Sequence, residues 1–387
     1  MTEWLNHQMT QCLIMSVAQI TFDRAASKAQ VNAERRRSML IDLFVTLATI
    51  AFALALAFLV LLITGKDPYV AYKALLTAPV TRLNRFGNFL EEATTLILLG
   101  LAISIPFRAR QFSLGAEGQI YLGALAAALV AIYVPMPPVI GLIVPIALAM
   151  AVGFLLGLLP GWMKAYLNAN EIVSTLMINA VVIRFYDFLL TNVLAEPGQG
   201  YIRSADIPDN SMFPRLTDLL GVSLSRFNLA FVLVIIMVVV VWLLIQRTTL
   251  GYEIRMVGSN EKFARYGGIN TKRTIMMSFA LGGAVAALAG VHLAMGIQGK
   301  LISGLSAGLG FEGIVVALLA RNNPLLVPIT GLFYAYLRVG GSSMETQSSV
   351  GSELVLIIQA VIILLVTSQV LVDFVKRRRV SDKAQEQ

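Results

Sequence analysis

The sequence predicts an all-α polytopic membrane protein with about ten transmembrane helices, one of them short or re-entrant. Of its 387 residues, 57% are hydrophobic and 13% are charged, whereas a soluble domain carries roughly 25% charged residues. Apolar runs of bilayer-spanning length recur along the chain and leave room only for short loops. These observations exclude a soluble enzyme, a disordered protein and a coiled coil.

Ten apolar runs, most of them bounded by proline, glycine or charged residues, mark the predicted spans. They cover about Ile41–Ile63, Phe89–Pro106, Glu117–Val134, Val139–Leu159, Glu171–Leu194, Phe227–Ile245, Thr274–Ile297, Gly310–Ala320, Pro324–Leu337 and Glu353–Phe374. The first is too long for the core of a signal peptide, so we expect it to be retained. The eighth is too short to cross a bilayer as a plain helix, so we expect a short or re-entrant helix buried in protein.

The charged residues predict the orientation of these spans. Residues 1–38 form a polar N-terminus, residues 39–375 the transmembrane domain and residues 376–387 a basic tail. With the N-terminus inside, 20 of the 30 Lys and Arg residues fall in inside segments and nine in outside segments. Because Lys and Arg are enriched in cytoplasmic loops, both termini are predicted to be cytoplasmic and the number of spans to be even.

Several kinds of chemistry are missing from the sequence. The net charge of +8 fits cytoplasmic loops and does not indicate a nucleic-acid partner. One cysteine, Cys12, and two histidines, His7 and His292, exclude a Cys-based or His-rich metal site. No G-x-x-x-x-G-K-[ST] phosphate loop occurs, so any ATP must be bound by another chain. We therefore predict no catalytic residue, no metal and no cofactor of its own.

A short internal repeat relates the two halves of the chain. G-A-E-G at 115–118 begins the third span and G-F-E-G at 310–313 begins the eighth. The two units are five spans apart, so they face opposite sides of the membrane. That is typical of an inverted repeat, here spans 2–5 against spans 7–10, and glycine-interrupted segments at matching positions indicate a permeation path. A chance match in a glycine-rich chain is the alternative.

Polar side chains within the spans are costly and often functional. Glu117 and Glu312 are expected to cap helix N-termini, beside any contact with substrate. Asn179 either lines a path or bonds a neighbouring helix. Arg184 and Asp187 lie three residues apart and are expected to pair. His292 is expected to make a bond between helices.

The loop at 247–273 is basic and partly apolar. Residues 260–266 have the character of a short helix, which Gly267-Gly268 can terminate. Such a helix suits docking onto another protein inside the cell, and an ordinary solvated loop is the alternative reading.

Four ordered stretches resemble a known family over about residues 40–374. They read F-S-L-G-A-E-G-Q at 112–119, N-E-I-V-S-T-L-M-I-N at 170–179, T-T-L-G-Y-E-I-R-M-V-G at 248–258 and G-L-G-F-E-G-I-V-V-A-L-L at 308–319. The chain is similar to permease subunits of ABC importers of the ribose and branched-chain amino acid class, and within it to nucleoside importer permeases. Ser113, Glu312 and the pair Glu91-Glu92 depart from the family pattern, and that pair leaves the exact substrate open.

The resemblance implies a bacterial plasma-membrane permease with ten helices and three partners. These are a cytoplasmic ATPase, a second permease that is homologous or identical, and an extracytoplasmic substrate-binding protein. The long N-terminus favours a heterodimer of two different permeases. The loop 247–273 becomes the element that couples to the ATPase, with Gly251, Arg255, Gly258 and Glu261 as its predicted residues. The predicted substrate pathway comprises Glu117, Gln119, Asn179, Phe311 and Glu312.

The predicted function is therefore an importer permease that forms the membrane path for nucleosides. A simple-sugar permease of the ribose type is the first alternative. A secondary transporter driven by H⁺ or Na⁺, with Glu117 and Glu312 as ion sites, is the second. A membrane-embedded enzyme lacks any supporting motif.

Overall fold

A computed structural model describes most of the predicted membrane domain. It covers residues 67–198, 200–215 and 227–348, and also residues 55, 58–59, 62, 351, 355–357 and 360. The chain divides into two units, and all helices described below belong to the unit Leu61–Ile363. The predicted N-terminus 1–38, the tail 376–387 and almost all of the first and tenth spans lie outside the described residues.

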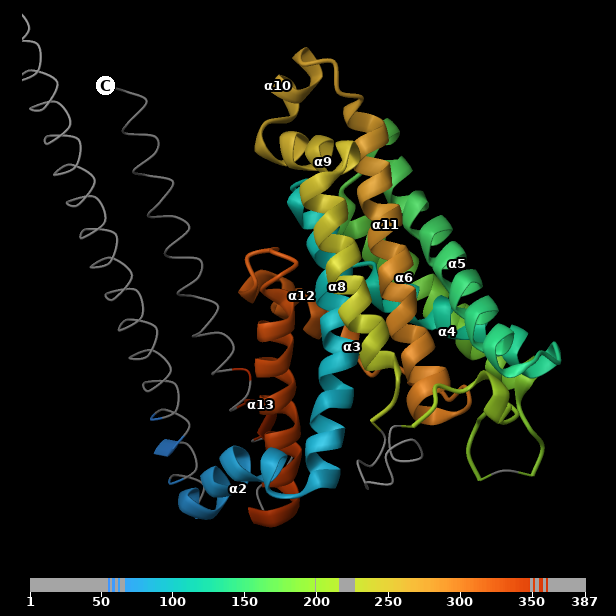
Figure 1. Cartoon of the computed structure of the whole chain (residues 1–387), viewed down its shortest axis with the longest axis vertical. Helices are drawn as coiled ribbons and strands as arrows, with labels where there is room; N and C mark the ends of the chain where they lie inside the picture. Colours follow the sequence, from blue (N-terminus) through green and yellow to red (C-terminus); the bar gives the residue numbers. More distant parts are fainter. Residues whose placement is uncertain are drawn as a thin grey trace, which may run out of the picture. The chain divides into compact units, whose positions relative to one another are not determined.

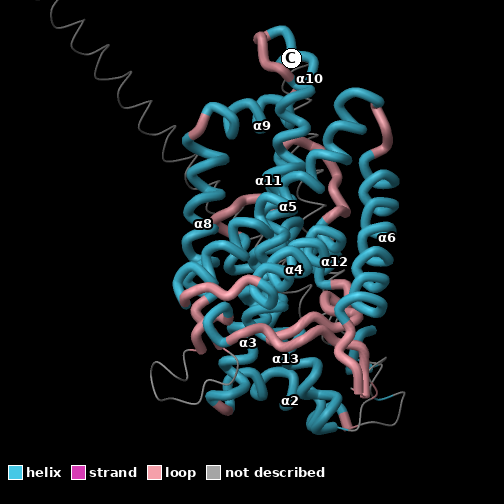
Figure 2. Tube along the Cα trace, turned by 90° about the vertical axis from the view of Figure 1, so that its right-hand side faces the viewer, coloured by secondary structure: helices cyan, strands magenta, loops and turns pink. Residues whose placement is uncertain are grey.

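The predicted all-α membrane fold is confirmed. Six helices of the described part are long and apolar enough to cross a membrane. They are α3 (Leu83–Arg108), α4 (Ala116–Tyr133), α5 (Pro138–Leu167), α6 (Glu171–Leu189, continued by the π-helical η1, Leu190–Leu194), α8 (Ala230–Arg247) and α11 (Thr271–Val291, continued by the π-helical η3, His292–Gln298). Within these described residues the only β-structure is two isolated bridges. Predicted spans two to seven are all present as helices (Figure 2).

The eighth predicted span is a short helix, as expected. It is α12 (Leu309–Leu319), and it is followed by α13 (Val327–Ser348) in place of the ninth span. The inner face of α12 is buried, including Gly310, Gly313 and Ile314. Its eleven residues are too short to cross a bilayer, and this inner face packs against α3 and α4.

Several helix boundaries differ from the prediction. The helix α5 does not stop at Pro160 but continues to Leu167 and ends at Asn168, which has a left-handed φ of 52°. Proline within a membrane helix is tolerated where neighbouring helices support it, and α5 packs here against Phe279 and Met276 of α11. Two more helices were not predicted: α2 (Pro68–Thr81) and α9 (Thr249–Ser259). The short helix expected at 260–266 is present as α10 (Glu261–Tyr266).

The helix α11 lies at the centre of the described bundle, against α3, α4 and α5 (Figure 1). Small residues make this close packing possible. A Cβ atom on Gly283 would overlap the carbonyl oxygen of Gly153 on α5, and a Cβ on Gly290 would overlap that of Ile120 on α4. Membrane helices associate through such small-residue contacts because lipid provides no hydrophobic force between them.

The outer helices present apolar faces. In α5, α6 and α8 less than a third of the most apolar window is buried, against more than four-fifths in α3 and α11. Ile143, Val181 and Ile235 are examples of large exposed apolar side chains on these three helices. At the two ends of this bundle, α2 lies opposite α9 and α10 (Figures 1 and 2).

Candidate functional site

The two G-x-E-G units meet inside the bundle. Glu117 lies in the first turn of α4, and its carboxylate accepts hydrogen bonds from the backbone N–H groups of Gly308 (3.1 Å) and Gly310 (2.7 Å) at the start of α12. A Cβ atom on Gly310 would lie 2.6 Å from the backbone nitrogen of Glu117, so only glycine permits this approach. Glu117 therefore caps a helix N-terminus as expected, but the helix is α12 and not its own α4.

Asn179 of α6 fixes the loop that leads into α4. Its Oδ1 accepts from the backbone N–H of Gly118 at 2.9 Å, and its Nδ2 donates to the carbonyl oxygen of Leu114 at 2.6 Å. Thr175, one turn earlier, accepts from the backbone N–H of Leu114. Of the two roles considered for Asn179, the structure shows the bond to a neighbouring element.

Glu312 does not cap a helix, contrary to the expectation from its position in the first turn of α12. Its Oε1 is bonded instead to the guanidinium of Arg338 on α13. The same guanidinium lies 3.5 Å from Oε2 of Glu92 on α3. A guanidinium is a full positive charge with N–H donors, and it attracts a carboxylate more strongly than the partial charge of a helix end does. One arginine thus bridges two carboxylates from two other helices.

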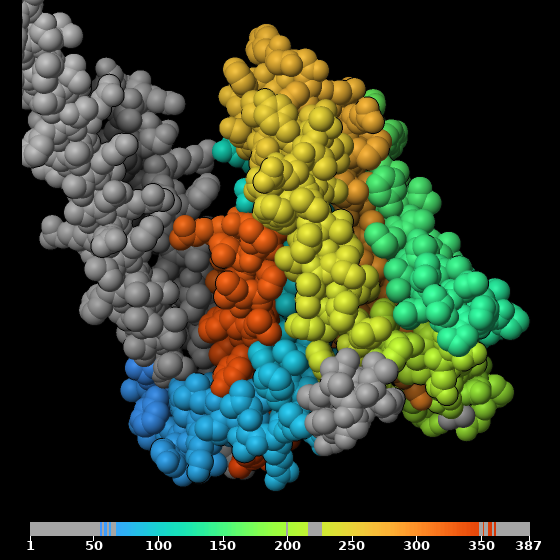
Figure 3. All heavy atoms as spheres, viewed as in Figure 1, coloured from blue at the N-terminus to red at the C-terminus, as the bar shows by residue number. Residues whose placement is uncertain are grey.

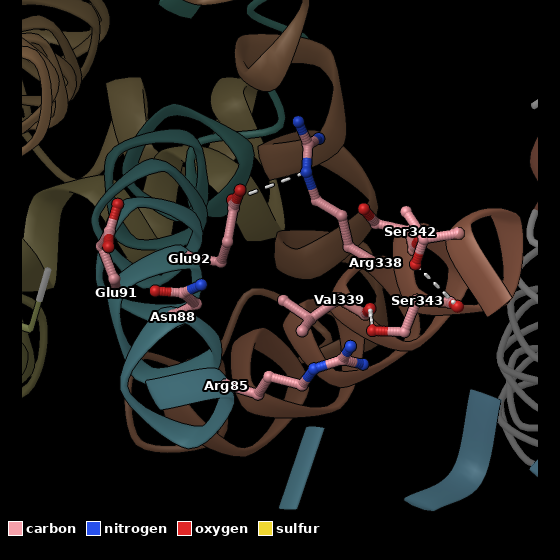
Figure 4. A pocket seen from close by; sticks show the side chains of 9 residues that line it. Arg85, Asn88, Glu91, Glu92, Arg338, Val339, Ser342 and Ser343 are labelled. Carbon is pink, nitrogen blue, oxygen red and sulfur yellow. Dashed lines mark hydrogen bonds and ion pairs between the residues drawn. The ribbon is translucent and has the colours of Figure 1, made fainter. Parts of the chain in front are cut away.

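This bridge borders a cavity of about 620 Å³ between α3 and α13. Figure 4 shows Glu92 and Arg338 pointing toward each other, with Asn88 one turn and Arg85 two turns away from Glu92 on α3. Ser342 and Ser343 supply hydroxyl groups from α13. The volume falls within the range of small-molecule sites, and the lining is mainly polar.

The predicted pathway residues are not brought together around this cavity. Glu117, Gln119 and Asn179 are each only 4% exposed and lie where α4 packs against α6, α11 and α12. Phe311 is exposed on α12, and Glu312 reaches the cavity only through Arg338. No residue of the cavity lining comes from α4 or α6.

The loop 247–273 forms a two-helix platform, α9 and α10. Gly251 and Gly258 are buried on α9. A Cβ on Gly251 would overlap the carbonyl oxygen of Leu244 on α8, and a Cβ on Gly258 would overlap that of Arg108 on α3. Arg255 donates from Nη1 to the carbonyl oxygen of Ile245. Three of the four predicted coupling residues therefore hold α9 against the ends of the membrane helices.

The exposed side of this platform carries aromatic and charged side chains. Tyr252 and Phe263 are exposed and Tyr266 is 92% exposed. Glu261, the fourth predicted coupling residue, lies on α10 and pairs with Arg265 at 3.6 Å. In Figure 3 the atoms of α9 and α10 lie open at the end of the bundle.

Arg108 connects this platform to the short helix. Its carbonyl oxygen contacts α9 at Gly258, and its Nε donates to the carbonyl oxygen of Asn322 at 2.6 Å. Asn322 lies in the turn that follows α12 and has a left-handed φ of 55°. Arg108 therefore links α9, through its backbone, to the turn after α12, through its side chain.

Loops cover the opposite end of α11. Ser204 exchanges hydrogen bonds with Leu301, and Lys300 pairs with Asp206 at 3.4 Å. Asp187 accepts from the hydroxyl of Ser303 at 3.2 Å. The expected pair of Asp187 with Arg184 is absent from the described ion pairs, because the loop after η3 supplies the partner instead.

His292 makes the expected bond between helices. Its Nδ1 lies 2.9 Å from the hydroxyl of Thr95 on α3, and its Nε2 lies 3.4 Å from Nδ2 of Asn228 at the start of α8. The residue begins the π-helical end of α11 and is buried. It ties three segments together at this point.

Sequence reasoning missed Arg338 and the exposed aromatic residues of the platform. Arg338 follows an apolar run and was counted only as a loop charge. An available signal was the pair Glu91-Glu92 within a span, since a carboxylate at that depth requires a cationic or hydrogen-bonding partner.

Comparisons with known proteins agree with this architecture. Residues 85–367 match the model of the family described as "Branched-chain amino acid transport system / permease component". The chain is 36% identical to a glucose ABC transporter permease of Haloferax volcanii over 86% of this chain and 88% of that one. It is 32% identical to a guanosine ABC transporter permease of Bacillus subtilis, over 86% and 95% of the two chains.

A nucleoside ABC transporter permease of Lactococcus lactis is 28% identical over 88% of this chain and 95% of its own. No solved structure gives a significant match. The family model covers well over half of the chain, and two relatives exceed 30% identity over most of their length. The chain therefore belongs to this permease family and is the membrane-spanning permease subunit of an ABC transporter, not an enzyme.

Proposed function

We propose that this permease imports nucleosides together with three partners: a cytoplasmic ATPase that binds ATP, an extracytoplasmic substrate-binding protein and a second permease. Transport follows from alternating access of a membrane path, which ATP binding and hydrolysis on the partner drive. The permease itself makes no covalent bond to the substrate.

The α9–α10 platform is the observation that carries this proposal. It is fixed to α3 and α8 by the contacts of Gly258 and Gly251, yet it exposes Tyr252, Phe263 and Tyr266. Exposed aromatic side chains on a rigid support are typical of protein–protein interfaces. Because the sequence has no phosphate-binding loop, an ATPase on another chain is the partner that fits this surface.

Coupling would pass from the platform to the membrane path through Arg108. Gly258 of α9 contacts Arg108, and Arg108 bonds Asn322 at the end of α12. These two contacts join α9 to α12. We assign the substrate route to the region beside α12, with Phe311 and Glu312 facing it. Glu117, Gln119 and Asn179 hold the start of α12 and α4 in place around it.

The distribution of charge supports a cytoplasmic platform. The loop 247–273 holds six Lys and Arg residues, whereas the segment 298–309 at the other end of α11 holds one. With this orientation both termini are cytoplasmic, and the loops around Ser204 and Lys300 face the binding protein outside. The membrane would be the bacterial plasma membrane.

A second permease is supported by the relatives. Haloferax volcanii contains both the glucose permease above and a putative glucose ABC transporter permease that is 26% identical to this chain over 245 residues. Two different permeases in one organism fit a heterodimer. The exposed apolar faces of α5, α6 and α8 offer area for such a partner as well as for lipid.

The substrate is proposed from the guanosine and nucleoside permeases among the relatives and from the nucleoside-type motifs of the sequence. A second candidate is a hexose such as glucose, which the 36% identical relative favours. Both substrates are neutral and rich in hydroxyl groups.

Uptake into proteoliposomes tests the proposal. The vesicles contain this chain, its ATPase and second permease, and the binding protein is added outside with labelled uridine, guanosine or glucose. ATP-dependent uptake of a nucleoside that excess glucose does not reduce is the expected result. Uptake of glucose but not of nucleosides would make glucose the substrate. Uptake without ATP would overturn the ATP-driven mechanism.

A further inference from the structure

We propose that the cavity between α3 and α13 is a binding station for a neutral polyhydroxylated solute, which it holds by vicinal hydroxyl groups on the Glu92–Arg338–Glu312 bridge. This inference rests on the proposed function but does not depend on which of the two candidate substrates is correct, because ribose and glucose both present vicinal hydroxyls.

The bridge offers donors and acceptors side by side. Arg338 has a planar fork of five N–H groups and no acceptor, whereas Glu92 and Glu312 are acceptors only. Each hydroxyl of a vicinal diol can donate to a carboxylate and accept from the guanidinium. The Nε contact to Glu92 is long for a hydrogen bond at 3.5 Å and is an ion pair, so a hydroxyl beside it can bond to both groups.

Other polar groups extend the site away from the bridge. Asn88 and Glu91 from α3 and Ser342 and Ser343 from α13 line the same cavity. Its volume of about 620 Å³ is sufficient for a nucleoside or a hexose. An apolar ligand would offer no hydrogen bond to this polar lining, which disfavours it.

The charges favour a neutral over an anionic ligand. The positive charge of Arg338 is already offset by Glu92 and Glu312. The lining itself holds two carboxylates, of Glu91 and Glu92, and two guanidinium groups, of Arg85 and Arg338. Glu312, outside the lining but paired with Arg338, adds a third carboxylate to the cluster. A phosphorylated solute would meet excess negative charge in a medium of low dielectric constant, and we expect it to be excluded.

Cysteine protection in the complete detergent-purified transporter tests the site. The native cysteine is first removed by Cys12→Ser, and Ser342→Cys then places a thiol in the cavity. We expect uridine or glucose at millimolar concentration to slow its modification at least about fivefold, and uridine 5′-monophosphate to have no effect. The control Asn192→Cys, exposed on η1 outside the cavity, should show no protection.

The charge is tested on the same thiol. The ratio of the modification rates for a cationic and an anionic thiosulfonate should be about tenfold higher at Ser342→Cys than at Asn192→Cys, because the one excess carboxylate of the cluster attracts the cation and repels the anion. Equal ratios would overturn the assignment of a negative cavity.

Substitutions of the bridge separate binding from a structural role. Glu92→Gln keeps the size of the side chain and removes one charged acceptor, so half-protection should require about tenfold more ligand. Arg338→Lys keeps the charge but loses the fork and should act in the same direction. Glu345→Gln makes the same change as Glu92→Gln on an exposed position of α13 outside the cavity and serves as the matched control.

The outcomes distinguish this site from the transport function. ATP-dependent uptake by the reconstituted transporter without any protection at Ser342→Cys would overturn the site and leave the importer. Protection by uridine or glucose without uptake of either would support the site and overturn the importer. Protection by uridine 5′-monophosphate equal to that by uridine would overturn selection against anions.

Discussion

Gly258 holds α9 close to the end of α3. Adding one methyl group there should push the α9–α10 platform away from the membrane helices. The added Cβ would overlap the carbonyl oxygen of Arg108, and backbone atoms on both sides prevent an easy adjustment. We expect Gly258→Ala to displace α9 at a cost of about 1–3 kcal/mol. ATP-dependent uptake in proteoliposomes should then fall about tenfold, while the permease still inserts and purifies.

The neighbouring Gly267 provides the control. A Cβ there would lie 3.5 Å from the nearest atom, an ordinary contact distance, so Gly267→Ala should retain uptake within about twofold. Equal loss in both variants would contradict a specific role for the contact with Arg108.

Glu117 should contribute to stability through the start of α12. In Glu117→Gln one amide oxygen remains as acceptor, but the amide nitrogen faces an N–H donor of Gly308 or Gly310. A buried donor left unsatisfied costs about 1–3 kcal/mol, so the melting temperature of the purified permease should fall. Glu196→Gln, at the surface pair with Arg203, should change stability by less than about 1 kcal/mol. Equal shifts would contradict the capping role.

Some of these residue roles were accessible from the sequence. The carboxylate at the start of the third span predicted a helix cap, because a carboxylate favours helix N-termini. That its partner is α12 depends on a contact between residues 193 positions apart, which no local pattern reports. The pair of Arg338 with Glu92 was not predicted either, because these residues are also far apart in the sequence.

At the scale of elements, the platform should act as a docking surface through its aromatic residues. Phe263 and Tyr266 are exposed on α10, and burial of such side chains dominates the affinity of many interfaces. We expect Phe263→Ala with Tyr266→Ala to weaken binding of the ATPase at least about tenfold, measured by co-purification at graded ATPase concentrations. Tyr69→Ala, an exposed aromatic residue on α2 at the other end, is the matched control and should bind normally. Equal binding of the ATPase by the unchanged permease, the double variant and Tyr69→Ala would contradict the assignment of α10 as the docking surface.

The long apolar helices were predicted well because length and hydropathy define them without tertiary information. The exceptions have tertiary causes. Pro160 predicted the end of α5, yet the helix continues to Leu167, where packing against α11 supports it. The helix α9 has a polar, glycine-containing sequence, and its contacts with α3 and α8 support it more than its own propensity does. The π-helical turns of η1 and η3 have no sequence signature.

At the scale of the whole molecule, the meeting of the two G-x-E-G units gives the internal repeat a physical meaning. Glu117 at the start of α4 contacts Gly310 at the start of α12, and both helices follow a non-helical segment. Two helices that begin at one point inside the bundle are what an inverted repeat places at its axis. The repeat remains a prediction, since the tenth span lies outside the described residues.

The orientation of the molecule can be decided with the single native cysteine. If both termini are cytoplasmic, Cys12 should not react with an impermeant thiol reagent on intact cells and should react after permeabilisation. On a Cys12→Ser background, Tyr201→Cys in the exposed loop after η1 should react on intact cells, and Tyr266→Cys on α10 should not. Reaction of Tyr266→Cys but not Tyr201→Cys would reverse the orientation. Since the ATPase is expected inside the cell, that result would also remove α10 as its docking surface.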